Sequence, residues 1–140
     1  MILSEELKRI EIARGWKTGG RETMQLAMQV LLDASSVNAC CASIKQYGAV
    51  FKRIVGENEN KASTFMQCLE NVIARRNHGM LIRQTYKVLF AVYEAQVVSV
   101  EHMLSWYAHI TSDMISKREQ QAIRNKARTT VQWLKVEDQE

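Results

Sequence analysis

The chain contains no proline in its 140 residues. Proline interrupts helices and marks turns, so a chain without it can form long uninterrupted helices. Apolar residues recur at spacings of three and four along most of the sequence, whereas no segment alternates apolar and polar residues long enough to predict a strand. The sequence therefore predicts an all-α fold.

Seven helical segments can be distinguished by their apolar stripes and by the residues that end them. Ser99 is a suitable N-cap for the sixth segment, and Ser116 and Glu119 form a capping box at the start of the seventh. The fifth segment is apolar on almost every side, which predicts a place in the middle of the helical stack. Short connections fit either an antiparallel bundle or a short solenoid of HEAT-type helix pairs. The stripes lie at about residues 3–10, 24–31, 37–54, 65–76, 80–94, 100–107 and 116–134.

Composition and charge narrow the class of protein. Hydrophobic residues make up 46% of the chain and charged residues 24%, which is typical of a globular domain, and the length suits one domain over residues 1–140. No apolar run approaches the roughly 20 residues that a membrane helix needs, and the charged N-terminus does not resemble a signal peptide. The three cysteines are an odd number, which favours a reducing compartment. We expect a cytoplasmic protein that binds no membrane.

The sequence carries no recognisable catalytic or metal-binding pattern. The spacings CxxC, HxxxH and HExxH are absent, as are the nucleophile elbow and the phosphate-binding loop. Cys41 and Cys68 fall on apolar stripes, which indicates buried thiols rather than nucleophiles. His102 and His109 are expected to be solvated or interfacial. The prediction is a protein that is not an enzyme and holds no metal or cofactor.

The last helical segment has a basic face. At 100° per residue, Lys117, Arg124, Arg128 and Lys135 project within about 40° of one another. Such a face suits an acidic partner or an RNA backbone, and it is equally typical of the solvated side of an amphipathic helix. No aromatic residues are interleaved with these cations, so direct nucleic-acid binding is not expected.

Two tryptophans mark the C-terminal third. Tyr107 lies on the apolar stripe of the sixth segment, so its neighbour Trp106 is expected off the centre of that stripe. Trp133 likewise lies beside the stripe of the seventh segment. Tryptophans at the edge of a core often anchor partner contacts, although each could equally pack one helix against another.

The same two regions resemble the paired aromatic-and-acidic boxes of the two-tryptophan domains. KVLFAVYEAQVVSVEHMLSWY (87–107) is similar to the first box, and VQWLKVEDQE (131–140) to the second. These domains end several eukaryotic translation initiation factors: factor 5, the epsilon subunit of factor 2B and factor 4 gamma, and also the factor-5-mimic proteins. Residues 24–33, 43–54 and 65–89 resemble the factor 5 domain most, and the match is weakest over 1–23.

The resemblance implies a HEAT-like antiparallel α-α solenoid of about seven helices with a scaffold role in the pre-initiation complex. Its implied partners are the lysine-rich tail of the factor 2 beta subunit, factor 3 and factor 1, with ribosome association as a further expectation. Alternatives within the family are the nucleotide-exchange region of factor 2B epsilon, acting on factor 2, and a factor-5-mimic translational regulator. The implied partner-binding residues are Tyr93, Glu94, Glu101, Trp106, Tyr107, Trp133, Glu137, Asp138 and Glu140.

One departure from the family pattern bears on the partner. The family's boxes are strongly acidic, but the acidic residues within 86–112 are only Glu94 and Glu101. The chain also carries a net charge of +4. Attraction to a lysine-rich tail is therefore weaker than the family pattern suggests. Aromatic anchoring would compensate, or the preferred partner would differ. The basic face could serve a second, acidic partner.

Overall fold

Residues 2–139 are described in the computed structural model, with side chains described for residues 5–137. Over this range the chain forms seven α-helices and two short 3-10 helices, with no strand. The elements are α1 (Ile2–Arg14), α2 (Arg21–Leu31), α3 (Val37–Val55), α4 (Glu59–Arg75), η1 (Arg76–Gly79), η2 (Ile82–Gln84), α5 (Thr85–Ala95), α6 (Val100–Ala108) and α7 (Lys117–Gln139). None of these helices is long and apolar enough to cross a membrane.

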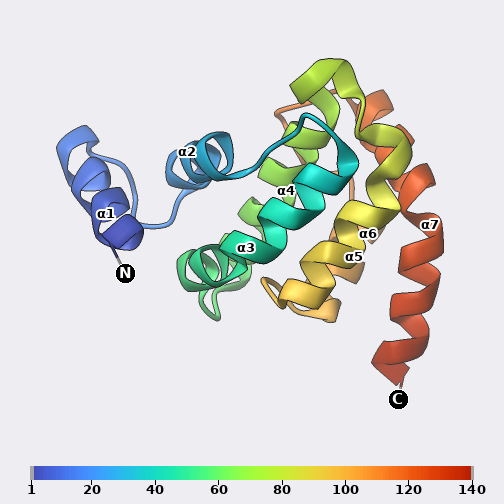
Figure 1. The fold of residues 1–140 in the computed structure, drawn as a ribbon. Coiled ribbons are helices and arrows are strands. Elements are labelled where there is room, and N and C mark those ends of the chain that lie inside the picture. The colour runs from blue at the N-terminus through green and yellow to red at the C-terminus, as the bar shows by residue number, and fades with distance from the viewer. Residues whose placement is uncertain (1, 140) are drawn as a thin grey trace.

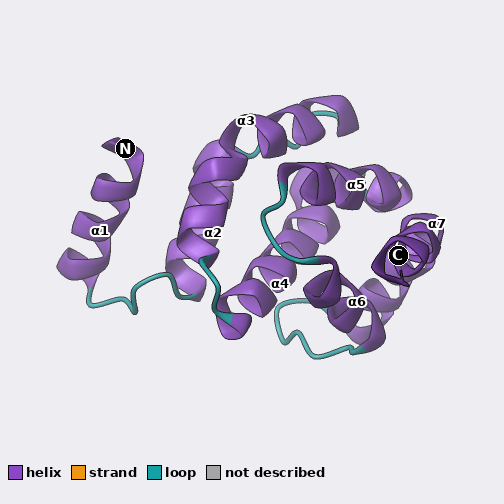
Figure 2. Cartoon of the chain, turned by 90° about the horizontal axis from the view of Figure 1, so that it is seen from below, coloured by secondary structure: helices purple, strands orange, loops and turns teal. Residues whose placement is uncertain are grey.

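The helices stack in two layers. One layer runs from α3 through α5 to α7, and the other runs from α2 through α4 to α6. Helices α2, α3, α4, α5 and α7 each pack most closely on a helix two places away along the chain, whereas α6 contacts both α4 and α7. Figure 1 shows the elements progressing from α1 at one end to α7 at the other, and Figure 2 shows the two rows from below. Such stacking of alternate helices is typical of a solenoid. The predicted all-α, HEAT-like fold is confirmed.

Local side-chain caps set several helix ends. The hydroxyl oxygens of Ser36 and Ser99 each accept the backbone N–H three residues further on, at 3.0 and 3.1 Å. Ser116 and Glu119 form the predicted capping box, with reciprocal hydrogen bonds of 3.1 Å. The Ser116 backbone N–H lowers the pKa of the Glu119 carboxyl. Gly56 ends α3 with φ at +58°, a conformation that glycine adopts without strain.

The junction between α4 and α5 differs from the prediction. The fifth helix was expected to begin at Met80, but α5 begins at Thr85 after two 3-10 turns. Residues 77–79 have φ values of 51, 57 and 73°, so the chain leaves the helical region completely. The Asn77 side-chain amide donates to the Ala34 carbonyl at 3.1 Å, which holds this turn against the α2–α3 connection. The apolar periodicity of the sequence cannot predict this left-handed turn, because a carbonyl distant in the sequence holds it.

Helix α1 is tied to the layers by a buried carboxylate. Glu11 is buried, and its Oε2 accepts from the Gly19 backbone N–H at 2.6 Å and from the Thr23 hydroxyl at 2.5 Å. Gly19 has φ at +67°, which lets the α1–α2 connection turn back toward Glu11. This contact explains how a helix with few apolar neighbours keeps its place beside α2.

The layer of α3, α5 and α7 depends on a close approach at Gly48. A Cβ atom added there would lie 2.9 Å from the Ala95 Cβ, so α3 and α5 meet with almost no space between them. Farther along α3, the ring of Phe51 packs edge-on against Phe65 of α4, with centroids 5.6 Å apart. The α3–α5 distance therefore requires a glycine in α3.

Replacing Gly48 with valine should lower the free energy of unfolding by about 1–3 kcal/mol, because the added methyl groups force α3 and α5 apart. Urea unfolding followed by far-UV circular dichroism measures this change. Ala49→Val is the matched control, since Ala49 is exposed on the same helix and should cost only about 0.5 kcal/mol in helix propensity. Equal effects of the two substitutions would contradict the close approach.

Candidate partner-binding site

An aromatic cluster is exposed where α5 lies against α7. The ring centroid of Trp133 lies 5.4 Å from that of Phe90 and 5.0 Å from that of Tyr93, both in edge-to-face geometry. Phe90 and Tyr93 stack on each other at 6.0 Å. Phe90 is 40% exposed and Trp133 is 39% exposed. Exposed aromatic rings that support one another in this way are suited to anchoring a partner, because they are already ordered before binding.

The cluster forms one wall of a groove between α3, α5 and α7. We call this the aromatic groove; its volume is about 530 Å³. The Thr130 hydroxyl donates to the Tyr86 carbonyl at 2.7 Å, which fixes the start of α5 against α7 at one end of the groove. The lining residues are Cys41, Lys45, Tyr86, Lys87, Phe90, Ala91, Glu94, Thr129, Thr130 and Trp133.

The charges along this groove are ordered from one end to the other. Both α5 and α7 run in the same direction here, since Tyr86 lies beside Thr130 and Phe90 beside Trp133. Lys87 lies near the beginning of α5, whereas Glu94 lies near its end and forms an ion pair with Lys45 of α3 at 3.0 Å. The groove is therefore cationic at the Lys87 end, and its acidic side chain lies at the other end.

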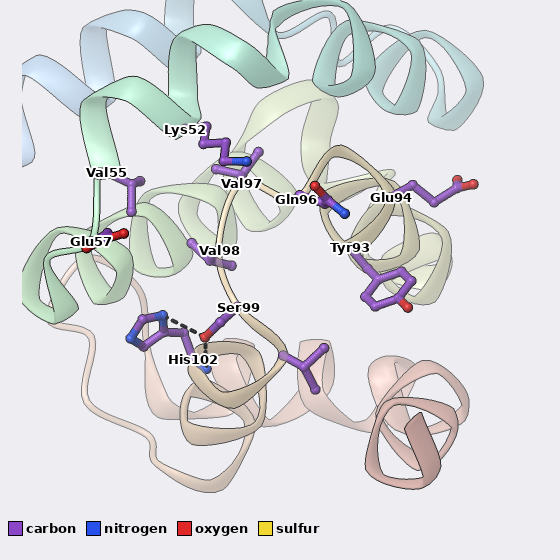
Figure 3. A pocket seen from close by; sticks show the side chains of 12 residues that line it. Lys52, Val55, Glu57, Tyr93, Glu94, Gln96, Val97, Val98, Ser99 and His102 are labelled. Carbon is purple, nitrogen blue, oxygen red and sulfur yellow. Dashed lines mark hydrogen bonds between the residues drawn. The ribbon is translucent and has the colours of Figure 1, made fainter. Parts of the chain in front are cut away.

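A second hollow adjoins the end of α5. It has a volume of about 540 Å³ and lies between the end of α3 and the α5–α6 connection, as Figure 3 shows. Glu57 and His102 lie on one side of it and Tyr93 and Glu94 on the other (Figure 3). Glu94 lines both this hollow and the aromatic groove, and Tyr93, which lines this hollow, contacts Trp133 of the aromatic groove.

Trp106 does not share that exposed surface. It is 9% exposed and lies in the core with Met103, whereas Tyr107 is half-buried, so the centre of the buried face of α6 is shifted from Tyr107 toward Trp106. The guanidinium carbon of Arg124 lies 4.4 Å from the Trp106 ring centroid. Trp106 therefore packs α6 against α7 and is unavailable as a partner anchor.

Arg124 is the clearest correction to the predicted basic face. It is 3% exposed, and its guanidinium pairs with the buried Glu70 carboxylate of α4. It also donates to the backbone carbonyls of Trp106 and His109, each at 2.9 Å. Burial raises the pKa of Glu70, and the adjacent Arg124 opposes that shift. Arg124 thus joins α4, α6 and α7, and the carbonyls at the end of α6 gain a cationic donor.

The remaining members of the basic face are Lys117, Arg128 and Lys135, all exposed. At 1.5 Å per residue along α7, Lys117 lies about 16 Å from Arg128, and Arg128 lies about 10 Å from Lys135. Both gaps equal or exceed the Debye length of about 8–10 Å at physiological salt. These three cations therefore act largely as separate charges.

The predicted acidic and aromatic residues are divided between two places. Tyr93, Glu94 and Trp133 meet at the aromatic groove. By contrast, Arg124 contacts Trp106 nine positions before Trp133 on α7, a separation of about 13 Å along the helix. The other predicted residues are placed as follows: Glu101 is exposed in the first turn of α6, Tyr107 is half-buried beside Trp106, and Glu137 is half-buried near the end of α7, while Asp138 and Glu140 lie outside the residues with described side chains.

The three thiols are buried or partly buried. Burial raises the pKa of Cys40 and of Cys68 to about 12, so neither is a thiolate near neutral pH. Cys41 is partly exposed in the aromatic groove, and burial raises its pKa as well. Among the side chains that the structure describes, no group of three or more histidine, cysteine, aspartate or glutamate residues is placed to hold a metal ion.

Sequence reasoning missed Tyr86, Lys87 and Phe90 as members of the site. The fifth segment was expected to be covered on most sides, yet Tyr86 and Phe90 are exposed on one face of α5. The signal was present, because Tyr86 and Phe90 are four residues apart and so share a helix face. A helix that is apolar all round but lies beside the last helix of a stack has one apolar face left uncovered.

The chain is thus a two-layered HEAT-like α-solenoid with an exposed aromatic groove between α3, α5 and α7. No family model matches the chain. It is 29% identical over 92 residues to eukaryotic translation initiation factor 5 of Mus musculus and, equally, of Rattus norvegicus. The aligned region is 66% of this chain and 21% of each relative, so the chain spans about a fifth of the length of the relatives it matches.

The fold comparison agrees with the sequence comparison. The solved structure of the C-terminal domain of translation initiation factor 5 at low pH superposes with a TM-score of 0.72 at 22% identity, covering 85% of this chain and 70% of that one. The predicted resemblance to the C-terminal domain of factor 5 is confirmed. The chain is thus similar in sequence and in fold to a translation initiation factor domain.

Proposed function

We propose that this chain is a cytoplasmic, non-catalytic scaffold domain that binds other translation initiation factors. The observation that carries the proposal is the pre-ordered cluster of Phe90, Tyr93 and Trp133, exposed on a domain that is similar to the factor 5 C-terminal domain. Aromatic anchors of this kind supply most of the binding energy in many protein interfaces. The proposed partners are the lysine-rich tail of the factor 2 beta subunit, factor 3 and factor 1.

The lysine-rich tail is proposed to bind at the end of the groove where α5 and α7 terminate. Glu94 is exposed there, and Glu137 lies four residues beyond Trp133 on α7. The aliphatic part of a lysine side chain can pack on the Tyr93 and Trp133 rings while its ammonium group faces a carboxylate. This arrangement needs fewer acids than a purely electrostatic surface, which fits a chain with a net charge of +4.

A binding assay with a fluorescently labelled peptide of the factor 2 beta lysine-rich tail tests this proposal. We expect the double variant Glu94→Lys with Glu137→Lys to weaken binding by about tenfold or more at low salt, since each change replaces an attraction with a repulsion. Glu5→Lys with Glu6→Lys makes the same change in net charge on exposed positions of α1 and should have little effect. Equal weakening by both pairs would show a non-specific charge effect and contradict the site.

The exposed cations Lys117, Arg128 and Lys135 support only a weaker, second proposal. They could contribute to binding of an acidic partner, but their spacing along α7 means that no compact basic patch is formed. A single substitution of Lys117, Arg128 or Lys135 should therefore change the association rate of an acidic partner, and the salt dependence of its binding, more than its affinity.

A further inference from the structure

The Lys87 end of the aromatic groove has a charge preference opposite to that of the proposed lysine-rich partner. Among the described side chains that line the groove, the charged ones are Lys45, Lys87 and Glu94. Glu94 is already paired with Lys45 at 3.0 Å, and Lys87 has no carboxylate within 4 Å among the described residues. The lining of the groove therefore leaves one cation uncompensated.

The neighbouring helix carries a cation one helical turn beyond this end of the groove. Lys126 is exposed and lies seven residues before Trp133, so the two side chains project from α7 within about 20° of each other. Thr130 lies between them on the chain and bonds to Tyr86 at the start of α5. Lys126 therefore lies one helical turn before Thr130, outside the residues that line the groove, whereas Lys87 lines it.

The apolar part of the groove is open beside Lys87. Tyr86 is 37% exposed, and the Lys87 ammonium lies 6.0 Å from its ring centroid. Phe90 lies one helical turn after Tyr86 on α5, toward the Glu94 end of the groove, and Trp133 of α7 packs against Phe90. A ligand that fills this space must place an apolar side chain against the exposed faces of Phe90 and Trp133, whose rings touch each other, and a negative charge toward Lys87.

We infer that the aromatic groove binds a peptide segment that carries acidic side chains next to an aromatic or large aliphatic one. The acid lies against Lys87, and the apolar side chain lies against the exposed faces of Phe90 and Trp133. This partner differs in charge from the lysine-rich tail of the proposed function, which occupies the Glu94 and Glu137 end. The inference therefore stands on the groove itself and extends beyond that function.

Two synthetic peptides of opposite charge test the inference on the full chain. The first is a labelled ten-residue peptide with one phenylalanine and one leucine among aspartates and glutamates, and the second replaces every acid with lysine. We expect the acidic peptide to bind and Lys87→Glu to weaken it about tenfold. Lys8→Glu, an equal change on exposed α1, should leave binding unchanged. Absence of acidic-peptide binding, or equal loss from both variants, would overturn the inference.

Cys41 provides an independent test of location. Its Sγ lies 3.5 Å from the Lys87 carbonyl oxygen in the groove, and the other two thiols are buried with pKa values raised to about 12. A thiol reagent at mildly alkaline pH should therefore modify Cys41 first. The acidic peptide should slow that reaction severalfold, and an unchanged rate at saturating peptide would overturn the inference.

The outcomes separate this inference from the proposed function. If the factor 2 beta tail fails to bind while the acidic peptide protects Cys41, the proposed function fails and the inference holds. If the tail binds and the acidic peptide does not, the inference fails alone. If the lysine peptide protects Cys41 more strongly than the acidic one, the assigned charge preference of the groove is wrong.

Discussion

Replacing Arg124 with alanine will lower the free energy of unfolding by about 3–5 kcal/mol, the range for removing one partner of a buried ion pair. The substitution leaves the Glu70 carboxylate in the core without its countercharge. It also removes the donors that satisfy the carbonyls of Trp106 and His109. Urea unfolding at pH 7 measures the change. Arg128→Ala, one turn further along α7 and exposed, should change stability by less than about 0.5 kcal/mol.

The pH dependence of the same variant identifies the cause. With Arg124 gone, burial of Glu70 is no longer opposed by the guanidinium charge, so the pKa of Glu70 in the folded chain rises further above that in the unfolded chain. A carboxyl whose folded pKa is raised stabilises the fold below its unfolded pKa, and this contribution is lost as pH rises through the folded pKa. The destabilisation should therefore be smaller near pH 4 than at pH 7. In a Glu70→Gln background this pH dependence should disappear, and its persistence would contradict the assignment to Glu70.

Arg124 also shows what helical periodicity can and cannot decide. Its projection lies about 20° from those of Lys117 and Lys135 and equally about 20° from that of the buried Val131. Residues at such a boundary are assigned to the core or the surface by their tertiary partners. Here the partner is Glu70, which lies 54 residues earlier and belongs to another helix. The pairing of α4 with α7 was needed before the burial of this arginine could be inferred.

The features that sequence predicted well are local ones. The Ser99 cap and the capping box of Ser116 and Glu119 each depend on residues within one turn, and each is present in the structure. The stacking of alternate helices was left open between bundle and solenoid, because the sequence has no strict repeat. The family resemblance favoured the solenoid, and the observed layers agree.

The burial of Trp106 was mispredicted because α6 is short. A helix of nine residues allows two neighbouring apolar faces with similar membership, one centred on Tyr107 and one on Trp106. Which of the two faces is buried depends on the positions of Arg124 and of helix α4. Trp133 lies on a much longer helix, where Ile123, Ala127, Val131 and Leu134 define the buried face more firmly, and its predicted place beside that face is observed.

The two tryptophans should therefore respond oppositely to substitution. Trp106→Ala is expected to cost about 3–5 kcal/mol of stability, as for other large-to-small aromatic changes in a core. Trp133→Ala should cost about 1 kcal/mol, because a large part of its surface is already in solvent. For binding of the factor 2 beta lysine-rich tail the order reverses, and Trp133→Ala should weaken the affinity by about 2 kcal/mol or more, roughly thirtyfold.

Conservative variants keep this comparison interpretable. Trp106→Phe retains a ring beside the Arg124 guanidinium and should preserve both the fold and the affinity for the tail. A loss of binding caused by Trp106→Ala alone would not locate a contact, since that change disturbs the helix that packs against α7. The decisive comparison is thus Trp133→Ala against Trp106→Phe, each checked for an unchanged circular dichroism spectrum at the assay temperature. If Trp106→Phe weakens binding of the tail and Trp133→Ala does not, the partner is anchored at α6 instead of at the aromatic groove.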